Sequence, residues 1–249
     1  ITINASKNNS NDVTIKITAV DNSDNVTVST CDVKIDKTAP VIDIKYDNNK
    51  ADSNSFFNAN RTATIVVTER NFVAKDVVVK ITNTDGKVPK LSSWKKVKGT
   101  GNLDDTKWTA TINYVADGDY TFYIAYTDKA GLKCKSINYA DGSVAPKAFT
   151  IDKTAPVVNV SYNNNTATNG NYFVAERVAT VVINEHNFNP ERVDFNITAT
   201  DDAKPIGLPR ISGWVSKGDV RTCNIYYSAD AKYDFDIYVT DKASNKAAD

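Results

Sequence analysis

An internal repeat is the feature that most limits how this 249-residue sequence can fold. The segment Ile35–Val41, which reads Ile-Asp-Lys-Thr-Ala-Pro-Val, returns unchanged as Ile151–Val157, 116 residues later. The match continues in the same register, because Glu69–Phe72 and Glu185–Phe188 both read Glu-x-Asn-Phe. We therefore expect the chain to fold as successive copies of one structural unit.

The repeat divides the chain into three expected parts. Residues 1–34 match the last strands of a preceding repeat, because the alternating apolar pattern of Val13–Ile17 aligns with that of Tyr120–Ile124. Residues 35–150 are expected to form a complete repeat, and residues 151–249 a second repeat that lacks its last strand.

The missing strand has a consequence for association. No counterpart of Ala148–Ile151 follows Asp241–Asn245, so we expect an unpaired strand edge in the second repeat. Unpaired edges attract strands from other chains. Strand exchange between chains is therefore an expected form of self-association, with Cys31–Ile35 as the candidate donor.

Residue composition favours an all-β fold. Val and Ile together number 46 and Thr 26, whereas Leu numbers 4 and Met 0. Because β-branched side chains favour strands and unbranched ones favour helices, this balance predicts strands throughout. The alternation of Ala63, Ile65 and Val67 with Thr64 further indicates strands with one buried face.

Strand number and spacing favour a sandwich. Each repeat contains about six or seven short strands, which is typical of an immunoglobulin-like sandwich, and a barrel is the structural alternative. Tyr120 and Tyr233 favour the sandwich, because a tyrosine in this setting opens strand F of such domains and hydrogen-bonds the backbone upstream. We predict tandem immunoglobulin-like β-sandwiches.

Charge and residue content exclude several function classes. Lys plus Arg and Asp plus Glu number 30 each, so no basic field favours nucleic acid. No apolar run is long enough for membrane insertion, and no glycine-rich loop could hold a phosphate. With one His and three Cys, the sequence predicts no catalytic residues and no cofactor, and the chain is interpreted as not an enzyme.

The single histidine is assigned to the surface. His186 is matched by Arg70 in the first repeat, and a catalytic histidine would not be interchangeable with arginine. Its neighbour Glu185 and the equivalent Glu69 are explained by a strand end that leads into a short turn. The segment Asn189–Arg192 predicts a cap followed by one helical turn.

An aspartate opens a tight connection at three equivalent positions. Asp21, Asp128 and Asp241 each begin a turn in which the carboxylate is expected to accept a backbone hydrogen bond. Calcium at the repeat junction is the alternative, because Asp36 and Asp152 add oxygen ligands there. No EF-hand-like loop is present, so the turn interpretation is favoured and no metal ligand is assigned.

Three tryptophans are the candidate binding residues. Trp94 and Trp214 occupy similar loop positions, where each either closes one end of the sandwich or presents a platform to a sugar or protein. Trp108 is replaced by Arg221 in the second repeat. It is therefore dispensable to the fold; packing as a lid on the core is the favoured interpretation, and a role in specificity is the alternative.

Three motifs carry a family resemblance: Asp-Lys-Thr-Ala-Pro, the pair Thr-Glu-Arg-Asn-Phe and Asn-Glu-His-Asn-Phe, and Asp-Gly-Asp-Tyr followed by Thr-Asp-Lys-Ala-Gly. Through them the chain resembles the bacterial Ig-like repeat domains of large Gram-positive (gut Firmicutes type) cell-surface proteins. The resemblance implies an extracellular, cell-surface location. It also implies a non-enzymatic, adhesin-like segment that binds a host or environmental ligand, with host immunoglobulin or a glycan among the candidate partners. Its alternatives are a rigid spacer and a glycan-binding accessory module of a secreted enzyme.

Overall fold

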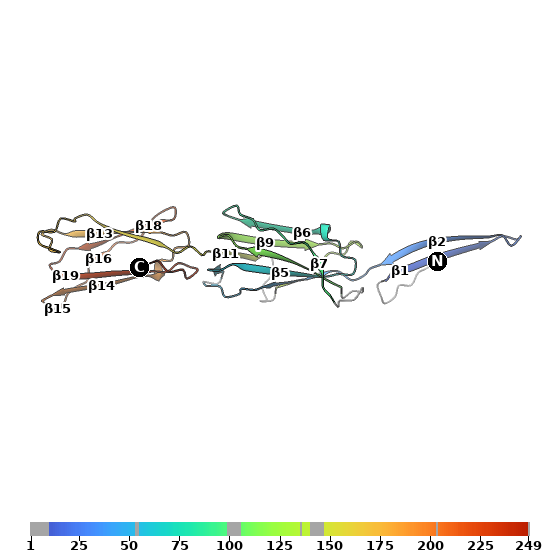
Figure 1. Cartoon of the computed structure of the whole chain (residues 1–249), viewed down its shortest axis with the longest axis horizontal. Helices are drawn as coiled ribbons and strands as arrows, with labels where there is room; N and C mark the ends of the chain where they lie inside the picture. The colour runs from blue at the N-terminus through green and yellow to red at the C-terminus, as the bar shows by residue number, and fades with distance from the viewer. Residues whose placement is uncertain are drawn as a thin grey trace. The chain divides into compact units, whose positions relative to one another are not determined.

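A computed structural model describes residues 10–52, 55–98, 106–134, 136–139, 147–202 and 204–248. Residues 1–9 of the expected preceding repeat lie outside this range. The described chain is all-β, as predicted, and its only helical segments are the 3-10 turns η1 and η2 (Figure 1). The elements are β1 (Ser10–Val20), β2 (Val26–Ile35), β3 (Val41–Tyr46), β4 (Phe56–Phe57), β5 (Arg61–Thr68), η1 (Ala74–Asp76), β6 (Val77–Asn83), β7 (Lys95–Lys96), β8 (Lys107–Tyr114), β9 (Gly118–Tyr126), β10 (Ser136–Tyr139), β11 (Lys147–Ile151), β12 (Val157–Tyr162), β13 (Arg177–Asn184), η2 (Pro190–Arg192), β14 (Val193–Asp201), β15 (Lys204–Pro205), β16 (Arg210–Ile211), β17 (Val215–Lys217), β18 (Val220–Tyr227) and β19 (Lys232–Val239).

Backbone contacts divide the chain into two compact units. The first unit comprises Ile1–Asn49, Arg61–Tyr114 and Tyr120–Ala148, and the second comprises Lys50–Asn60, Val115–Asp119 and Phe149–Asp249. The second unit therefore contains the whole of the expected second repeat, and the first unit contains most of the first repeat.

The strands of the described residues form five sheets. One two-stranded sheet is the antiparallel pair β1–β2, in which most side chains are exposed. Two larger sheets have the orders β10-β3-β5-β8-β7 and β4-β11-β9-β6, and two more have the orders β12-β13-β18-β16, with β17 also on β18, and β15-β14-β19. Strand β10 pairs parallel with β3, and β11 pairs parallel with β4.

Alternation along the strands sets the core, as the sequence predicts. In β5 every second residue is buried, and Ala63, Ile65 and Val67 are fully inaccessible to solvent. Strand β13 repeats the pattern in the second unit, where its buried residues pack with Cys223 and Ile225 of β18. Both units therefore bury one face of an equivalent central strand.

An arginine anchors the asparagine-rich turn that follows β3. Arg61 is 2% exposed, its Nε donates to the Asn48 carbonyl at 2.7 Å, and its Nη2 donates to Asn49 Oδ1 at 3.1 Å. The guanidinium also lies 3.7 Å from the centre of the Tyr46 ring. Arg177 makes the equivalent contacts in the second unit, where it lies over the Tyr162 ring at the same 3.7 Å.

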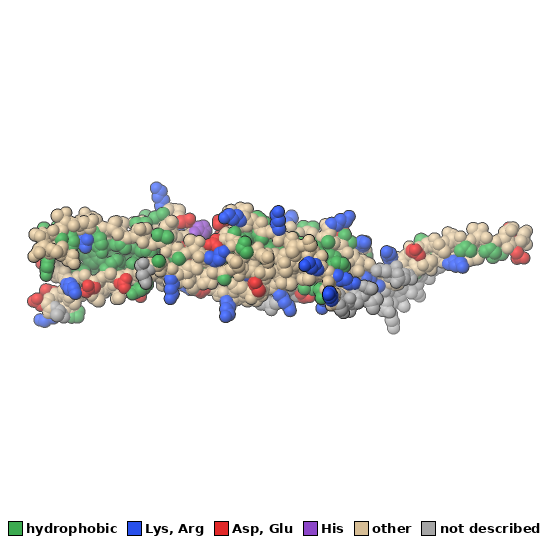
Figure 2. Space-filling view, viewed as in Figure 1, with side chains coloured by type: hydrophobic (Ala, Val, Ile, Leu, Met, Phe, Trp, Pro, Cys, Tyr) green, Lys and Arg blue, Asp and Glu red, His purple; other side chains and the backbone are tan. Residues whose placement is uncertain are grey.

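Strand β19 leaves part of the second unit's core accessible. It is an end strand of its sheet among the described residues, and Tyr233, Phe235 and Ile237 on its inner face are only partly buried. The space-filling view shows hydrophobic side chains gathered between the β13–β18 layer and the β14–β19 layer of this unit (Figure 2). A strand edge and apolar surface therefore occur together here.

Candidate functional site

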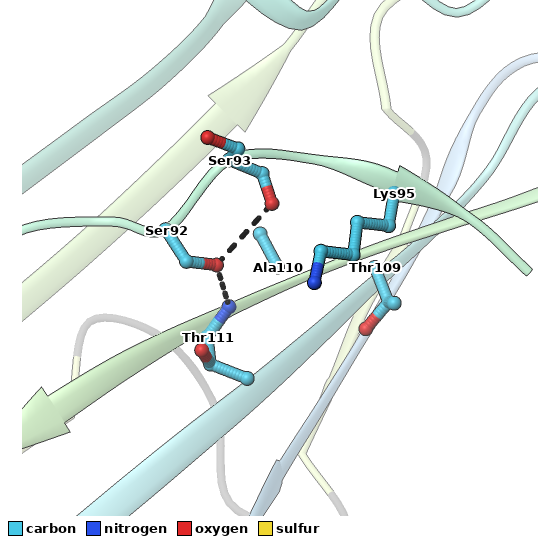
Figure 3. A pocket seen from close by; sticks show the side chains of 6 residues that line it. All are labelled: Ser92, Ser93, Lys95, Thr109, Ala110 and Thr111. Carbon is cyan, nitrogen blue, oxygen red and sulfur yellow. Dashed lines mark hydrogen bonds between the residues drawn. The ribbon is translucent and has the colours of Figure 1, made fainter.

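A shallow pocket lies where the loop before β7 crosses β8 (Figure 3). It measures about 310 Å³ and is lined by Ser92, Ser93, Lys95 and Thr109–Thr111. The Ser92 hydroxyl accepts a hydrogen bond from the Thr111 amide at 2.8 Å and donates to the Ser93 carbonyl at 3.4 Å. Because this oxygen is held by backbone groups, it serves as a loop anchor.

The same anchor recurs in the second unit. Ser212 Oγ accepts from the Asn224 amide at 2.9 Å and donates to the Gly213 carbonyl at 3.0 Å. The pocket's serine is therefore a shared structural element, and the loop it holds carries the tryptophan.

The two tryptophans of the first unit pack on one phenylalanine. Phe72 contacts Trp94 edge to face and stacks on Trp108, with ring centres 5.1 Å apart in both pairs. Tyr126 completes the cluster at 5.5 Å. Both candidate binding rings therefore have aromatic partners within the first unit.

The second unit contains a related cluster, in which Phe195 of β14 stands where the first unit has Val79 of β6. Trp214 lies 5.1 Å from Phe188 and stacks on Phe195 at 6.1 Å. Where the first unit has Trp108, Arg221 places its guanidinium 5.7 Å from the Phe188 ring centre. A cation–π contact thus takes the place of ring stacking, which explains how the fold accepts either residue.

The histidine forms a surface pair. His186 Nδ1 lies 3.0 Å from Asp219 Oδ1, and the two side chains are 65% and 54% exposed. This hydrogen bond raises the pKa of His186. The exposure of both side chains agrees with the assignment of His186 to the surface.

An acidic cluster brings together carboxylates that are far apart in the sequence. Asp36 of the junction segment, Glu69 directly after β5 and Asp128 after β9 each offer an oxygen within 4.8 Å of the other two. Glu69 and Asp128 are buried. Asn71 ties the cluster together, because its side-chain amide donates to Asp36 at 2.7 Å and its backbone amide donates to Glu69 at 2.7 Å.

The second unit has an equivalent cluster. Asp152, Glu185 and Asp241 meet the same 4.8 Å condition, and all three are buried. Asn187 again donates to both of its acidic neighbours, at 2.6 Å in each case. Burial, with the nearby charges of Asp152 and Asp241, raises the pKa of Glu185 to about 7, and burial also raises the pKa of Asp241.

The two clusters differ at one turn residue. Asp128 Oδ1 accepts from the Leu132 amide at 2.8 Å, and Asp241 Oδ1 accepts from the equivalent Asn245 amide at 2.9 Å. The Asn245 side chain also donates to Asp241 Oδ2 at 2.8 Å. Leucine has no such donor, and Asp128 Oδ2 is buried without a hydrogen-bond partner.

These clusters were only partly predictable. The aspartates act as turn openers, as expected, and η2 has the predicted cap, with the Asn189 side chain accepting from the Glu191 amide at 3.1 Å. The sequence analysis identified the aspartates and glutamates one by one, but it did not predict that three of them form a cluster in each unit. The available signal was the recurrence of all three positions in both repeats.

The outward faces of equivalent strand pairs differ in charge. On β6 and β9, Val78 and Lys80 lie exposed, with Tyr123 opposite Lys80. On β14 and β19, the exposed positions include Asp194 and Asn196, with Asp236 opposite Asn196, so this face is acidic.

Comparison with protein-family models and with curated proteins finds no match for the chain. None of the helices in the described part of the chain has both the length and the apolar character that a bilayer crossing requires.

Proposed function

We propose that the chain is a non-enzymatic segment of a bacterial cell-surface protein, made of tandem immunoglobulin-like β-sandwiches, that binds a host or environmental ligand. The paired sheets of each unit support the fold assignment. So does Tyr233, whose hydroxyl donates to the Ala229 carbonyl at 3.1 Å, four residues upstream, as a tyrosine corner does. The extracellular location rests on the motif resemblance.

The observation that carries the binding function is the contrast between the two outward faces. The residues shared by both repeats are accounted for by the core, the aromatic clusters, the anchors and the acidic clusters. The Lys80–Tyr123 pair and the Asn196–Asp236 pair occupy the same place in the two units but present different chemistry. Residues that the fold does not require can differ between the units, and a few such residues can determine which partner an interface binds.

A rigid spacer is the second candidate. In the junction segment Asp36–Pro40, Asp36 accepts hydrogen bonds from Thr38 and Asn71 at 3.2 and 2.7 Å, and the proline restricts the backbone. A fixed junction suits a protein that displays another domain. A glycan-binding accessory module remains the third class to separate by experiment.

The deciding experiment offers the full chain to host serum and mucus in a pull-down and to a glycan array. Retention of a protein such as immunoglobulin supports the adhesin-like function. Retention of glycans alone supports the accessory module, and retention of neither contradicts ligand binding and leaves the spacer.

Two double variants, each of which gives one unit the cross-strand pair of the other, test whether the outward faces bind the ligand. Lys80→Asn with Tyr123→Asp gives the first unit the second unit's cross-strand pair, and Asn196→Lys with Asp236→Tyr does the reverse. We expect one exchange to weaken retention of the captured partner and the other to leave it unchanged or to strengthen it. Equal retention by both variants and the unmodified chain would remove these faces from the interface.

A further inference from the structure

The cluster of Asp36, Glu69 and Asp128 gathers three carboxylates, and the amide groups of Thr38, Asn71 and Leu132 donate hydrogen bonds to them. Such bonds orient the oxygens but do not cancel their charge. Buried negative charges at this separation repel one another strongly unless a cation or a proton compensates them.

One oxygen of the cluster has no hydrogen-bond partner among the described residues. Asp128 is 6% exposed, its Oδ1 is occupied by the Leu132 amide, and its Oδ2 is buried without a hydrogen bond. A buried carboxylate oxygen in this condition carries a desolvation cost that nothing in the fold offsets. Asp128 Oδ2 is therefore the oxygen of the cluster that is best placed to bind an external cation.

The spacing suits a calcium ion. Oxygen ligands lie about 2.3–2.6 Å from Ca²⁺, so two of them on opposite sides of one ion are about 5 Å apart. The three cluster oxygens lie within 4.8 Å of one another and so fit around a single ion. Mg²⁺ needs a tighter and more regular octahedron, which makes calcium the better match to three carboxylates on three separate segments.

We propose that Asp36, Glu69 and Asp128 form a calcium-binding site in the first unit, in which Asp128 Oδ2 is a ligand. The ion would join the junction segment, the end of β5 and the turn after β9. This inference does not depend on the proposed ligand-binding function, because none of the three carboxylates belongs to the outward faces of β6 and β9.

The equivalent cluster in the second unit provides an internal comparison. There the Asn245 side chain donates to Asp241 Oδ2, so the corresponding oxygen already has a partner. An ion would have to share that oxygen with the amide donor, which lowers the gain from binding there. We therefore expect the cluster of Asp152, Glu185 and Asp241 to bind calcium more weakly than the first cluster.

The test measures binding of Ca²⁺ alone to the full chain by calorimetric titration after removal of metal with EDTA, with Mg²⁺ titrated in parallel. We expect saturable calcium binding within the range of extracellular modules, below about 1 mM, and weaker magnesium binding. The melting temperature should rise between EDTA and about 10 mM calcium, because an ion that binds only the folded state stabilises it.

Two variants locate the site. Asp128→Asn should weaken the tighter calcium site by about tenfold or more, because it removes the charge of a ligand. Asp194→Asn, which changes an exposed carboxylate on β14, is the matched control and should bind calcium as the unmodified chain does. Loss of affinity in both variants would overturn the assignment.

Leu132→Asn tests the role of the unpartnered oxygen without altering any carboxylate. It should give Asp128 Oδ2 the internal donor that Asn245 gives Asp241, and so weaken calcium binding while the protein melts no lower in EDTA. This variant decides the question if Asp128→Asn fails to fold. The proposal is overturned if the full chain binds no calcium at about 10 mM, or if Leu132→Asn binds as tightly as the unmodified chain.

Discussion

At the scale of single residues, Phe72 and Phe188 are the rings on which the neighbouring aromatic and cationic side chains pack. Each lies three residues after the carboxylate that ends the central strand, and each holds a tryptophan at 5.1 Å. Aromatic side chains packed this way contribute through buried area and ring geometry together. The tryptophans are therefore expected to affect stability first.

Replacement of Trp94 by Ala should destabilise the first unit by about 2 kcal/mol, because the contact with Phe72 is lost and a cavity forms beside a partly exposed ring. Urea unfolding of the full chain measures the change. Lys95→Ala, which alters an exposed neighbour on β7, is the control and should unfold at the same urea concentration as the parent chain. An unchanged midpoint for Trp94→Ala, combined with lost ligand retention, would instead favour the exposed-platform interpretation.

The exchange of Trp108 for Arg should be tolerated, because Arg221 shows that a guanidinium can take the same place over the phenylalanine. We expect a loss below about 1.5 kcal/mol, compared with about 3 kcal/mol for Trp108→Ala, which provides neither stacking nor a cation–π contact. Unfolding by urea compares the two variants. Equal losses would show that the cation–π contact contributes nothing here.

At the scale of elements, the sequence predicts what depends on local periodicity and misses what depends on how segments meet. The buried face of β5 follows from a period of two, and the cap of η2 follows from Asn189 and Pro190. The acidic clusters could not be located in this way, because each joins a junction, a strand end and a turn that only the folded sheets bring together. The anchoring roles of Arg61 and Arg177 were missed for the same reason.

Strand β5 begins at an anchor whose geometry is specific to arginine. Arg61→Lys should lower the free energy of unfolding by about 1–3 kcal/mol, because an ammonium cannot reproduce the two donor directions to Asn48 and Asn49 or stack as a plane on Tyr46. Arg177→Lys makes the same change at a less buried site and should cost less. Calorimetric melts of both variants check the order, and the reverse order would contradict the burial argument.

At the scale of the whole molecule, the two units show how one framework supports different surfaces. Their central strands, aromatic clusters and acidic clusters are equivalent, while the outward faces of β6–β9 and β14–β19 are not. Selection on a repeated framework of this kind can change a face without disturbing the core. The edge of β19 is a further difference, because there the backbone itself is offered for pairing.

That edge should accept an added strand. A peptide with the β11 sequence Lys147–Ile151 should raise the melting temperature of the second unit, because it would pair with β19 and cover Phe235 and Ile237. A peptide with the same residues in scrambled order is the control. Sedimentation without peptide should show association that increases with protein concentration, and the β11 peptide should suppress it by occupying the same edge. If neither peptide shifts the melting temperature and the chain sediments as a monomer at all concentrations, β19 is not a docking edge and strand exchange between chains does not occur.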